Sequence, residues 1–380
     1  MMEEIRARGC RPKIALFIAG MGVGGAERVF LNLARELCLK GFSVDLVAGT
    51  FHGAANLELL PAAVRLVDLK MNRMSLGSLR LIAYLRREKP AALLAAGDHT
   101  NCLAVLSGIL AGTRDRVFIN AVNMISPQLL MVSQPKRWLF EKFIRFCFPR
   151  ARAVIAVSEG VAAELKNTFS VSPGNLKVIY TPIITKELST LAAASVDHIW
   201  FKEGAPPVII TLGGLKPVKD QETLIRAFAL VRQTADARLV IIGEGDRRNC
   251  LETLINNLGL NGYASLVGFK ENPFAFIAKS KVFVLSSVSE GLPSVLIEAL
   301  ACGCRVVSTD CNSGPNEILR GGQLGRLVPV GNVAAMAEAI CASLREEGVT
   351  TCRNEDLIPF TVESSAKAYL KVLLGEERPS

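Results

Sequence analysis

Short runs of hydrophobic residues alternate along the chain with longer segments in which hydrophobic positions recur every three or four residues. The runs have the length of buried strands and the periodic segments that of helices, so the pattern predicts repeated strand–helix units. Such repeats build a parallel sheet with helices on both faces. The first half is expected to form elements over Lys13–Ala19, Ala26–Leu39, Ser43–Ala48, Val64–Leu69, Ser78–Glu88, Ala91–Ala95, Asn101–Ala111, Val117–Ala121, Ala153–Val157, Glu159–Thr168 and Lys177–Ile179.

The hydrophobic pattern fades between Thr181 and Pro207 and then resumes. Prolines occur at both ends of this segment, as in a connection between domains. A chain of 380 residues can form two cores, and we expect one doubly wound α/β domain over residues 1–190 and a second over residues 191–360. Elements expected after the connection are Val208–Leu212, Gln221–Gln233, Arg238–Gly243, Arg247–Leu258, Ser265–Val267, Lys281–Leu285, Arg305–Ser308, Val333–Leu344 and Thr361–Leu374.

Composition places the chain among folded proteins and makes its first half basic. Hydrophobic residues make up 50% of the chain and charged residues 21%, which excludes a disordered protein. The net charge of +9 is uneven, because Met1–Thr190 holds 25 Lys and Arg against 14 Asp and Glu. Such an excess of basic residues is typical of proteins that contact nucleic acid or an anionic membrane surface.

Cysteine usage and hydropathy predict a cytoplasmic location. The ten cysteines include no C-x-x-C pair, so we expect reduced core residues. Met1–Arg11 is charged and lacks the apolar core of a secretory signal. Hydrophobic stretches such as Cys102–Gly112 are too short to span a bilayer.

The segment Ser286–Glu317 combines a strand end, a polar turn and an apolar helix followed by another strand. At the carboxyl end of a parallel sheet, the first N–H groups of such a helix hold anions. We expect an anion site at Gly291, Leu292, Pro293 and Ser294. Glu290 on the turn and Glu298 within the helix bracket this site, so a carboxylate can reach hydroxyl groups beyond a bound phosphate.

Simpler roles for the two glutamates are a helix cap for Glu290 and a solvated surface charge for Glu298. The surface role fits Glu298 poorly, because its neighbours in sequence are Val295, Leu296, Ile297, Ala299 and Leu300. A helix that is apolar nearly all round is buried, and a glutamate inside it needs a polar partner.

A glycine-rich loop follows the first predicted strand. Gly20, Gly22 and Gly25 have the G-x-G-x-x-G spacing of dinucleotide-binding loops. That fingerprint requires an acidic residue at the end of the second strand, but this strand ends in A-G-T-F and Asp45 lies inside it. The mismatch disfavours a dinucleotide site, and a tight turn without a ligand is a further possibility.

A second glycine-rich loop follows the strand Val208–Leu212. Gly213 and Gly214 are followed by Lys216 and Lys219 before a helix, which makes a plausible phosphate cradle. The loop lacks the Ser or Thr that a Walker loop places after its lysine to bind magnesium. The alternative is a lysine-rich turn that only faces solvent.

Several of these motifs together resemble a known family. Glu290 and Glu298 with E-G-L-P between, and the continuation Asp310–Leu319, are similar to the signature of the retaining glycosyltransferases of family 4 (group 1). The resemblance implies the GT-B fold, in which two Rossmann-like domains face a central cleft. It also implies that the second domain binds a nucleotide diphosphate-sugar, and that the last helix, within residues 361–380, packs back on the first domain.

The resemblance assigns donor-binding roles residue by residue. Gly24 and Gly25 correspond to the family's first loop near the donor phosphates. Lys219 matches a lysine that faces the diphosphate, whereas Gly214 stands where the family usually carries an arginine; Lys216 is the candidate to replace that cation. The turn holding Phe269 and Lys270 corresponds to the nucleobase contact.

The remaining assignments concern the transferred sugar and the acceptor. By resemblance Glu298 binds the ribose hydroxyls and Glu290 orients the sugar. A histidine of the family's first domain matches Asn123 by spacing, and His99 is a second candidate. Both residues follow predicted strands at the edge where ligands bind, although a polar residue in a loop commonly serves as a cap or turn former.

The implied reaction moves a sugar from a UDP- or GDP-linked donor to a saccharide or lipid-linked saccharide in surface polysaccharide or lipopolysaccharide assembly. The resemblance implies retention of configuration, no metal and no cofactor other than the donor itself, and the chain contains no D-x-D motif. Two other functions stay open: a nucleotide-sugar epimerase of the same fold, and a non-catalytic nucleotide-sugar-binding protein.

The segment Lys136–Arg152 interleaves aromatic residues with Lys and Arg and holds one acid, Glu141. A basic helix with aromatic edges suits contact with an anionic membrane, which favours a lipid-linked acceptor and a peripheral location on the membrane's inner face. Alternatively, the aromatic residues pack on the sheet. Nucleic acid is not expected, because none of its binding modules is present.

Overall fold

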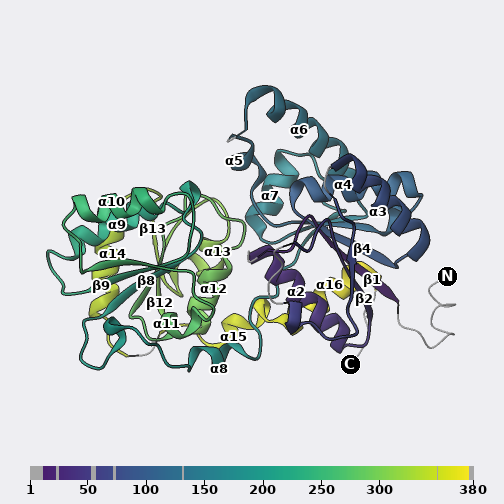
Figure 1. The fold of residues 1–380 in the computed structure, drawn as a ribbon. Helices are drawn as coiled ribbons and strands as arrows, with labels where there is room; N and C mark the ends of the chain where they lie inside the picture. Colours follow the sequence, from purple (N-terminus) through teal and green to yellow (C-terminus); the bar gives the residue numbers. More distant parts are fainter. Residues whose placement is uncertain are drawn as a thin grey trace. The chain divides into compact units, whose positions relative to one another are not determined.

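A computed structural model describes residues 12–22, 25–52, 57–71, 74–130, 132–348 and 350–375. The chain divides into two compact units, labelled by their elements in Figure 1. Unit 1 comprises Met1–Ile183 and Pro359–Ser380, and unit 2 comprises Ile184–Ile358. The division falls in the segment where the hydrophobic pattern fades.

Unit 1 is built on a seven-stranded parallel sheet with the order β3-β2-β1-β4-β5-β6-β7. The inner strands are buried on both sides, which explains why they appear in the sequence as continuous hydrophobic runs. The strands are β1 (Lys13–Ile18), β2 (Ser43–Ala48), β3 (Arg65–Asp68), β4 (Ala92–Ala96), β5 (Val117–Ala121), β6 (Ala153–Ala156) and β7 (Leu176–Val178).

The last helix of the chain packs on the sheet of unit 1, where it lies beside α2 (Figure 1). Tyr369 of this helix is fully buried, and its hydroxyl accepts a 3.1 Å hydrogen bond from Asn120 Nδ2 of β5. The helices of unit 1 are α2 (Gly25–Leu39), α3 (Met74–Glu88), α4 (Asp98–Ala111), α5 (Ile125–Leu130), α6 (Gln134–Cys147), α7 (Glu159–Asn167) and α16 (Val362–Leu374).

Unit 2 holds a six-stranded parallel sheet with the order β10-β9-β8-β11-β12-β13. Its strands are β8 (Val208–Leu212), β9 (Arg238–Ile242), β10 (Ala264–Gly268), β11 (Val282–Leu285), β12 (Arg305–Thr309) and β13 (Arg326–Val328). Its helices are α8 (Leu188–Ala192), α9 (Gln221–Val231), α10 (Arg248–Asn257), α11 (Phe274–Ala278), α12 (Ser294–Ala301), α13 (Pro315–Ile318), α14 (Val333–Arg345) and α15 (Asn354–Leu357).

The prediction of two doubly wound α/β sheets is confirmed, with differences at several helix ends. Helix α4 begins at Asp98 rather than Asn101, so His99 lies in its first turn. The basic helix expected over Lys136–Arg152 ends at Cys147, because Pro149 lacks the N–H that would continue it and a 3₁₀ turn follows. Ser158 caps α7, since its side-chain oxygen accepts a hydrogen bond from the N–H of Val161.

Asp45, in the middle of β2, has a structural role. Its carboxylate is buried and accepts a 2.9 Å hydrogen bond from Arg65 Nε and a 2.6 Å bond from the Tyr84 hydroxyl. Glu88 joins this network, and hydrogen bonds from Arg65 and Lys13 lower its pKa to about 2. Because Asp45 is committed to these partners, the structure gives no support to a dinucleotide site.

Among the helices that the structure describes, none combines the length and the apolar character needed to cross a bilayer.

Candidate functional site

In unit 2 the loop after β8 folds two lysine side chains over two glycines. A Cβ atom on Gly213 would lie 3.9 Å from Cδ and Cε of Lys219, and one on Gly214 would lie 3.7 Å from Cε of Lys216. The Lys216 side chain therefore runs beside the position at which an arginine was expected. Two ammonium groups thus belong to one short loop at the carboxyl end of the sheet.

This loop rests on a second glycine pair that the sequence analysis missed. Gly243 has a φ of +142°, and a Cβ atom there would lie 2.0 Å from the carbonyl oxygen of Gly213. A Cβ on Gly245 would lie 2.5 Å from the carbonyl oxygen of Leu215. The loops after β8 and β9 therefore pack backbone against backbone, which only glycine permits. The signal was present in the sequence as a G-E-G triplet that begins on the last residue of the predicted strand Arg238–Gly243.

Glu290 contacts Lys219. Lys219 Nζ lies 2.6 Å from Glu290 Oε1, and the same oxygen accepts a 2.6 Å hydrogen bond from the Ser287 hydroxyl. The side chain of Glu290 is only 10% exposed. Glu290 is therefore neither a cap of α12 nor a solvated charge, but one half of a partly buried ion pair.

Two hydrogen bonds to backbone carbonyl oxygens hold the two loops together beside this ion pair. The Ser286 hydroxyl donates a 2.8 Å hydrogen bond to the carbonyl oxygen of Lys219, and Val288 N–H donates to the carbonyl oxygen of Val218 at 2.9 Å. The relative placement of Lys219 and Glu290 is thus fixed by the main chain as well as by their charges.

The start of α12 is shaped by the segment that follows β12. Pro293 occupies the N-cap position and provides no side-chain cap. Gly291 O accepts a 2.8 Å hydrogen bond from the Ser313 hydroxyl, and a Cβ atom on Gly314 would lie 2.5 Å from Pro293 Cδ. Leu296 N–H donates to the carbonyl oxygen of Pro293 at 3.0 Å. Ser294 and Val295 come too early in α12 to bond within it, so their N–H groups suit an anion.

Two other predicted residues of this segment are buried, as expected for an apolar helix and the turn before it. Leu292 is buried, and Glu298 is 1% exposed inside α12. The simpler role of Glu298 as a solvated surface charge is wrong. Whether Glu298 binds a ribose stays a prediction.

The turn after β10 adjoins the same loops. Gly243 N–H donates a 3.0 Å hydrogen bond to the carbonyl oxygen of Gly268. Phe269 is 63% exposed, and Lys270 Nζ lies 5.9 Å from the centre of the Phe276 ring. An exposed aromatic face beside the two glycine loops can stack on a planar group such as a nucleobase.

In unit 1 the predicted residues lie after β1, β4 and β5. Gly24 falls outside the described residues, and Gly25 opens α2 with no atom within 4 Å of its Cβ position. The His99 ring stacks on Phe140 of α6 with ring centres 3.9 Å apart, and burial lowers the pKa of His99. Asn123 is exposed between β5 and α5.

Two acidic residues beside this edge were not predicted. Asp98 opens α4, and burial together with the negative charge of Glu164 raises the pKa of Asp98 to about 6. Glu164 accepts hydrogen bonds from the N–H groups of Ile125 and Ser126 at 2.7 and 2.8 Å, so it fixes the start of α5. The sequence offered one signal, an acid directly after Gly97 at a strand end.

The described part of the chain brings no three side chains of His, Cys, Asp or Glu together in an arrangement that would hold a metal ion.

Comparison with known proteins agrees with this architecture. The family profile described as "Glycosyl transferases group 1" matches residues 197–355, and the profile "Glycosyltransferase Family 4" matches residues 23–187. The lipopolysaccharide core biosynthesis glycosyltransferase LpsE of Rhizobium meliloti is 26% identical, with 93% of this chain and 96% of LpsE covered.

A relative from Campylobacter jejuni and a solved structure extend the likeness over almost the whole chain. The former, N-acetylgalactosamine-N,N'-diacetylbacillosaminyl-diphospho-undecaprenol 4-alpha-N-acetylgalactosaminyltransferase, is 29% identical over 378 residues, covering 96% of this chain and 98% of its own. The crystal structure of HepE from Anabaena in complex with UDP-glucose has a TM-score of 0.72 at 18% identity, with 95% of both chains covered. The protein is therefore an enzyme of the group 1 glycosyltransferase family, with the two-domain GT-B fold.

Proposed function

We propose that the protein transfers a hexose-type sugar from a nucleotide diphosphate-sugar to a lipid-linked saccharide with retention of configuration. One observation carries the donor part of this proposal: Lys219 is paired with Glu290 directly beside Gly213, Gly214 and the uncapped start of α12. Cations, a flexible backbone and free helix N–H groups are together the chemistry that holds a diphosphate.

The electrostatics of this site suit a departing diphosphate. As the sugar–phosphate bond breaks, negative charge grows on the leaving oxygens, and fixed cations near them lower the barrier. Lys219 and Lys216 supply two such charges from one loop. Glu290 holds Lys219 in place before the donor binds and then orients the sugar, while Glu298 binds the ribose.

Retention fits a reaction on one face of the sugar. In this proposal the leaving phosphate accepts the proton of the attacking hydroxyl, the acceptor oxygen bonds to the anomeric carbon, and the bond to the phosphate breaks. No covalent sugar–enzyme intermediate forms. Lysine charges neutralise the diphosphate without a metal ion, and the nucleotide-sugar is a co-substrate rather than a cofactor. Asn123 and His99 are the proposed acceptor-side residues.

The names of the relatives support the classes of donor and acceptor. The Campylobacter jejuni relative is named for a diphospho-undecaprenol acceptor and LpsE for lipopolysaccharide core biosynthesis, while HepE was crystallised with UDP-glucose. A UDP-sugar donor, with GDP as the alternative base, and a polyprenyl-linked or lipopolysaccharide acceptor are the corresponding proposals for this chain. They place its activity in surface polysaccharide assembly.

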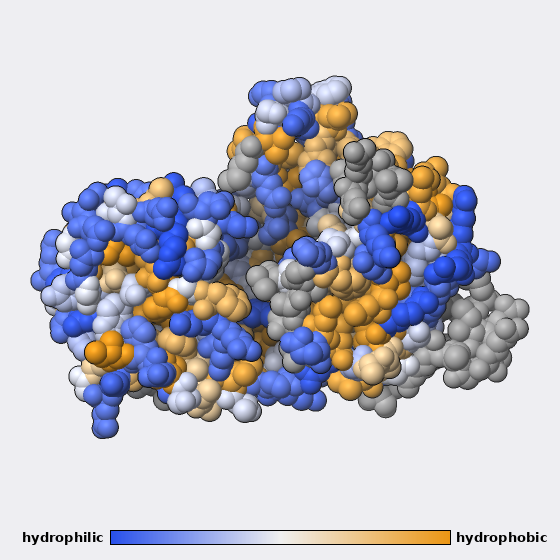
Figure 2. Space-filling model, viewed as in Figure 1, coloured by the Kyte–Doolittle hydropathy of each residue, from blue (hydrophilic) through white to orange (hydrophobic). Residues whose placement is uncertain are grey.

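Helix α6 supports peripheral contact with the membrane that carries such an acceptor. Trp138 is 62% exposed and Phe146 45% exposed, whereas Ile144 and Cys147 face the core. Lys142 Nζ lies 5.7 Å from the centre of the Trp138 ring. Figure 2 shows hydrophobic and hydrophilic residues interspersed over this helix. Exposed aromatic rings among cations suit the headgroup region of an anionic bilayer.

A thermal-shift series with UDP-, GDP- and ADP-sugars tests the donor, because a bound ligand raises apparent stability. The chosen donor is then incubated with and without a polyprenyl diphosphate-linked saccharide. We expect transfer to the lipid-linked saccharide and only slow hydrolysis without it. An epimerised donor in the incubation without acceptor would favour the epimerase alternative, and a donor that binds but never turns over would favour the binding protein.

Co-sedimentation with vesicles tests membrane contact. We expect vesicles with phosphatidylglycerol to bind the protein. The double substitution Trp138→Ala with Phe146→Ala should weaken binding by about tenfold, because it removes the two rings that would be buried in the bilayer. The matched control is Trp200→Ala in unit 2. Equal binding of both variants would exclude this role for α6.

A further inference from the structure

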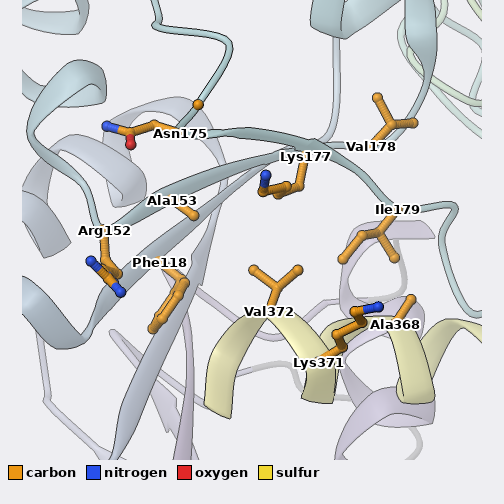
Figure 3. A pocket seen from close by; sticks show the side chains of 11 residues that line it. Phe118, Arg152, Ala153, Asn175, Lys177, Val178, Ile179, Ala368, Lys371 and Val372 are labelled. Atoms are coloured by element: carbon orange, nitrogen blue, oxygen red, sulfur yellow. The ribbon is translucent and has the colours of Figure 1, made fainter. Parts of the chain in front are cut away.

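Unit 1 carries a groove of about 570 Å³ between the edge of its sheet and the C-terminal part of α16 (Figure 3). None of the residues assigned above to the donor or the acceptor lines it. The lining residues are Phe118, Arg152, Ala153, Gly174, Asn175, Lys177, Val178, Ile179, Ala368, Lys371 and Val372.

The groove runs along β7 and none of its lining residues belongs to the loops that carry the acceptor-side candidates. Arg152 directly precedes β6 and Asn175 directly precedes β7, so the groove reaches the amino ends of these strands. His99 and Asn123 follow the carboxyl ends of β4 and β5. The end of the groove that holds Arg152 and Asn175 is thus opposite to the carboxyl ends of β4 and β5, whereas Ile179 follows the carboxyl end of β7.

The charge of the groove is positive. Arg152 before β6, Lys177 of β7 and Lys371 of α16 contribute cations, and no Asp or Glu is among the described residues that line it. Figure 3 shows Lys177 on the strand across from α16, which carries Lys371 and Val372. An anion in the groove would meet several cations and no carboxylate from the lining.

The rest of the lining is mostly apolar. Phe118 and Ile179 are buried beneath the groove, and Val178, Ala368 and Val372 add aliphatic surface. Asn175 is the sole uncharged polar side chain among the described lining residues. A small phosphorylated metabolite needs several uncharged donors and acceptors for its hydroxyl groups. This lining instead matches a molecule whose phosphate is joined to hydrocarbon.

The chain links the groove to α6. After α6 ends at Cys147, a 3₁₀ turn over Phe148–Arg150 leads within two residues to Arg152. Arg150 stacks on the exposed Phe146 ring, with the guanidinium carbon 3.9 Å from the ring centre. Basic residues therefore continue from the exposed face of α6 into the groove.

We propose that this groove binds an anionic phospholipid, with its phosphate at Arg152 and Lys177 and the first methylenes of an acyl chain against Phe118 and Val372. The site is distinct from donor binding and sugar transfer, so it can be tested without either. It would give the protein a preference for anionic over zwitterionic lipid.

The test uses the full chain and short-chain lipids below the concentration at which they form micelles, so that α6 meets no bilayer. Isothermal titration with dihexanoyl phosphatidylglycerol is compared with dihexanoyl phosphatidylcholine and with glycerophosphoglycerol, which lacks acyl chains. We expect saturable binding of phosphatidylglycerol and at least about fivefold weaker binding of each comparison compound. Binding of glycerophosphoglycerol as tightly as the lipid would overturn the proposal in favour of a metabolite site.

Charge reversal locates the site. Lys177→Glu is expected to weaken phosphatidylglycerol binding by at least about fivefold, the effect of roughly one basic residue near an anionic lipid. Lys166→Glu on α7 changes the net charge equally at an exposed position outside the groove and is expected to bind as the parent does. Equal binding by the two variants, or equal binding of both lipids by the parent, would contradict the proposal.

Discussion

Lys219 Nζ and Glu290 Oε1 lie 2.6 Å apart, although 71 positions separate the two residues in the chain. The contact joins the loop after β8 to the turn before α12, two segments with separate chemical signals in the sequence. A lysine held this way loses little conformational freedom when a diphosphate arrives, which makes binding more favourable. The ion pair is therefore best understood as a preorganised part of the proposed donor site.

Glu290→Gln keeps the size of the side chain but removes its charge. We expect the rate of sugar transfer to fall by about 100-fold, because the sugar and Lys219 are no longer held in the reactive geometry. UDP binding should change by less than about threefold, because the loss of a preorganised Lys219 and the removal of a negative charge beside the diphosphate oppose each other. Steady-state rates and calorimetric UDP affinity check this pair of outcomes. Weaker UDP binding with an unchanged turnover rate would contradict the role given to Glu290.

Lys216 is proposed to replace the family's arginine. Lys216→Ala should weaken UDP binding by about tenfold, a typical loss for one charge-assisted hydrogen bond. Gly214→Arg in that background should restore most of the affinity, because the nearest atoms to a Cβ at Gly214 lie 3.7 Å or more away. Calorimetry on both variants measures the rescue. If Lys216→Ala binds UDP as the parent does, Lys216 does not take the arginine's place.

Alanine substitutions at Gly243 and Gly214 are a matched pair that tests how the loops after β8 and β9 pack. Gly243→Ala should destabilise unit 2 by about 3 kcal/mol or more, since its Cβ would lie 2.0 Å from the Gly213 carbonyl oxygen at a φ of +142°. Gly214→Ala meets only ordinary contacts and should change stability by less than about 1 kcal/mol. Urea unfolding compares the two. Equal stability would show that the loops after β8 and β9 do not pack as described.

Asp98 should make stability depend on pH. Its pKa is raised from 3.8 to about 6 in the folded protein. Between these two values the folded state binds more protons than the unfolded chain, so stability falls as the pH rises through this window and stays lower above it. Asp98→Asn cannot ionise and should be more stable than the parent above about pH 6, by up to about 3 kcal/mol.

Calorimetric unfolding at about pH 5 and about pH 7.5 checks this prediction. The difference in the free energy of unfolding between Asp98→Asn and the parent should grow by about 1 kcal/mol from the lower to the higher pH. Asp115→Asn, at an exposed position in the same unit, is the control and should show no such trend. An advantage that is the same at both pH values would mean that Asp98 does not titrate between them.

The sequence predicted the folds of both units because parallel strands are buried on both faces and so form continuous hydrophobic runs. Glycines and carboxylates at strand ends also indicated where chemistry could lie. The ends of the helices were predicted less accurately. The end of α6 depends on Pro149, whose effect could have been inferred, whereas the start of α4 at Asp98 follows a glycine at a φ of +94° that no hydrophobic pattern reveals.

Contacts between distant segments could not be predicted. Lys219 and Glu290 were each singled out from local motifs, yet their pairing depends on how two loops fold across the sheet edge. Asp98 was missed because its raised pKa comes from burial and from Glu164, which belongs to another helix. The position of Lys216 beside Gly214 was anticipated only as a substitute for an absent arginine.

Lys216 and Lys219 are proposed to hold the nucleotide diphosphate, and calorimetric binding of UDP and uridine is the decisive measurement. For Lys216→Ala with Lys219→Ala, UDP affinity should fall by about 100-fold, because two charge-assisted contacts are lost. Uridine binding should stay as in the parent, and Lys279→Ala at an exposed position of unit 2 should leave both unchanged. Unchanged UDP affinity in the double variant would show that these two lysines do not hold the diphosphate.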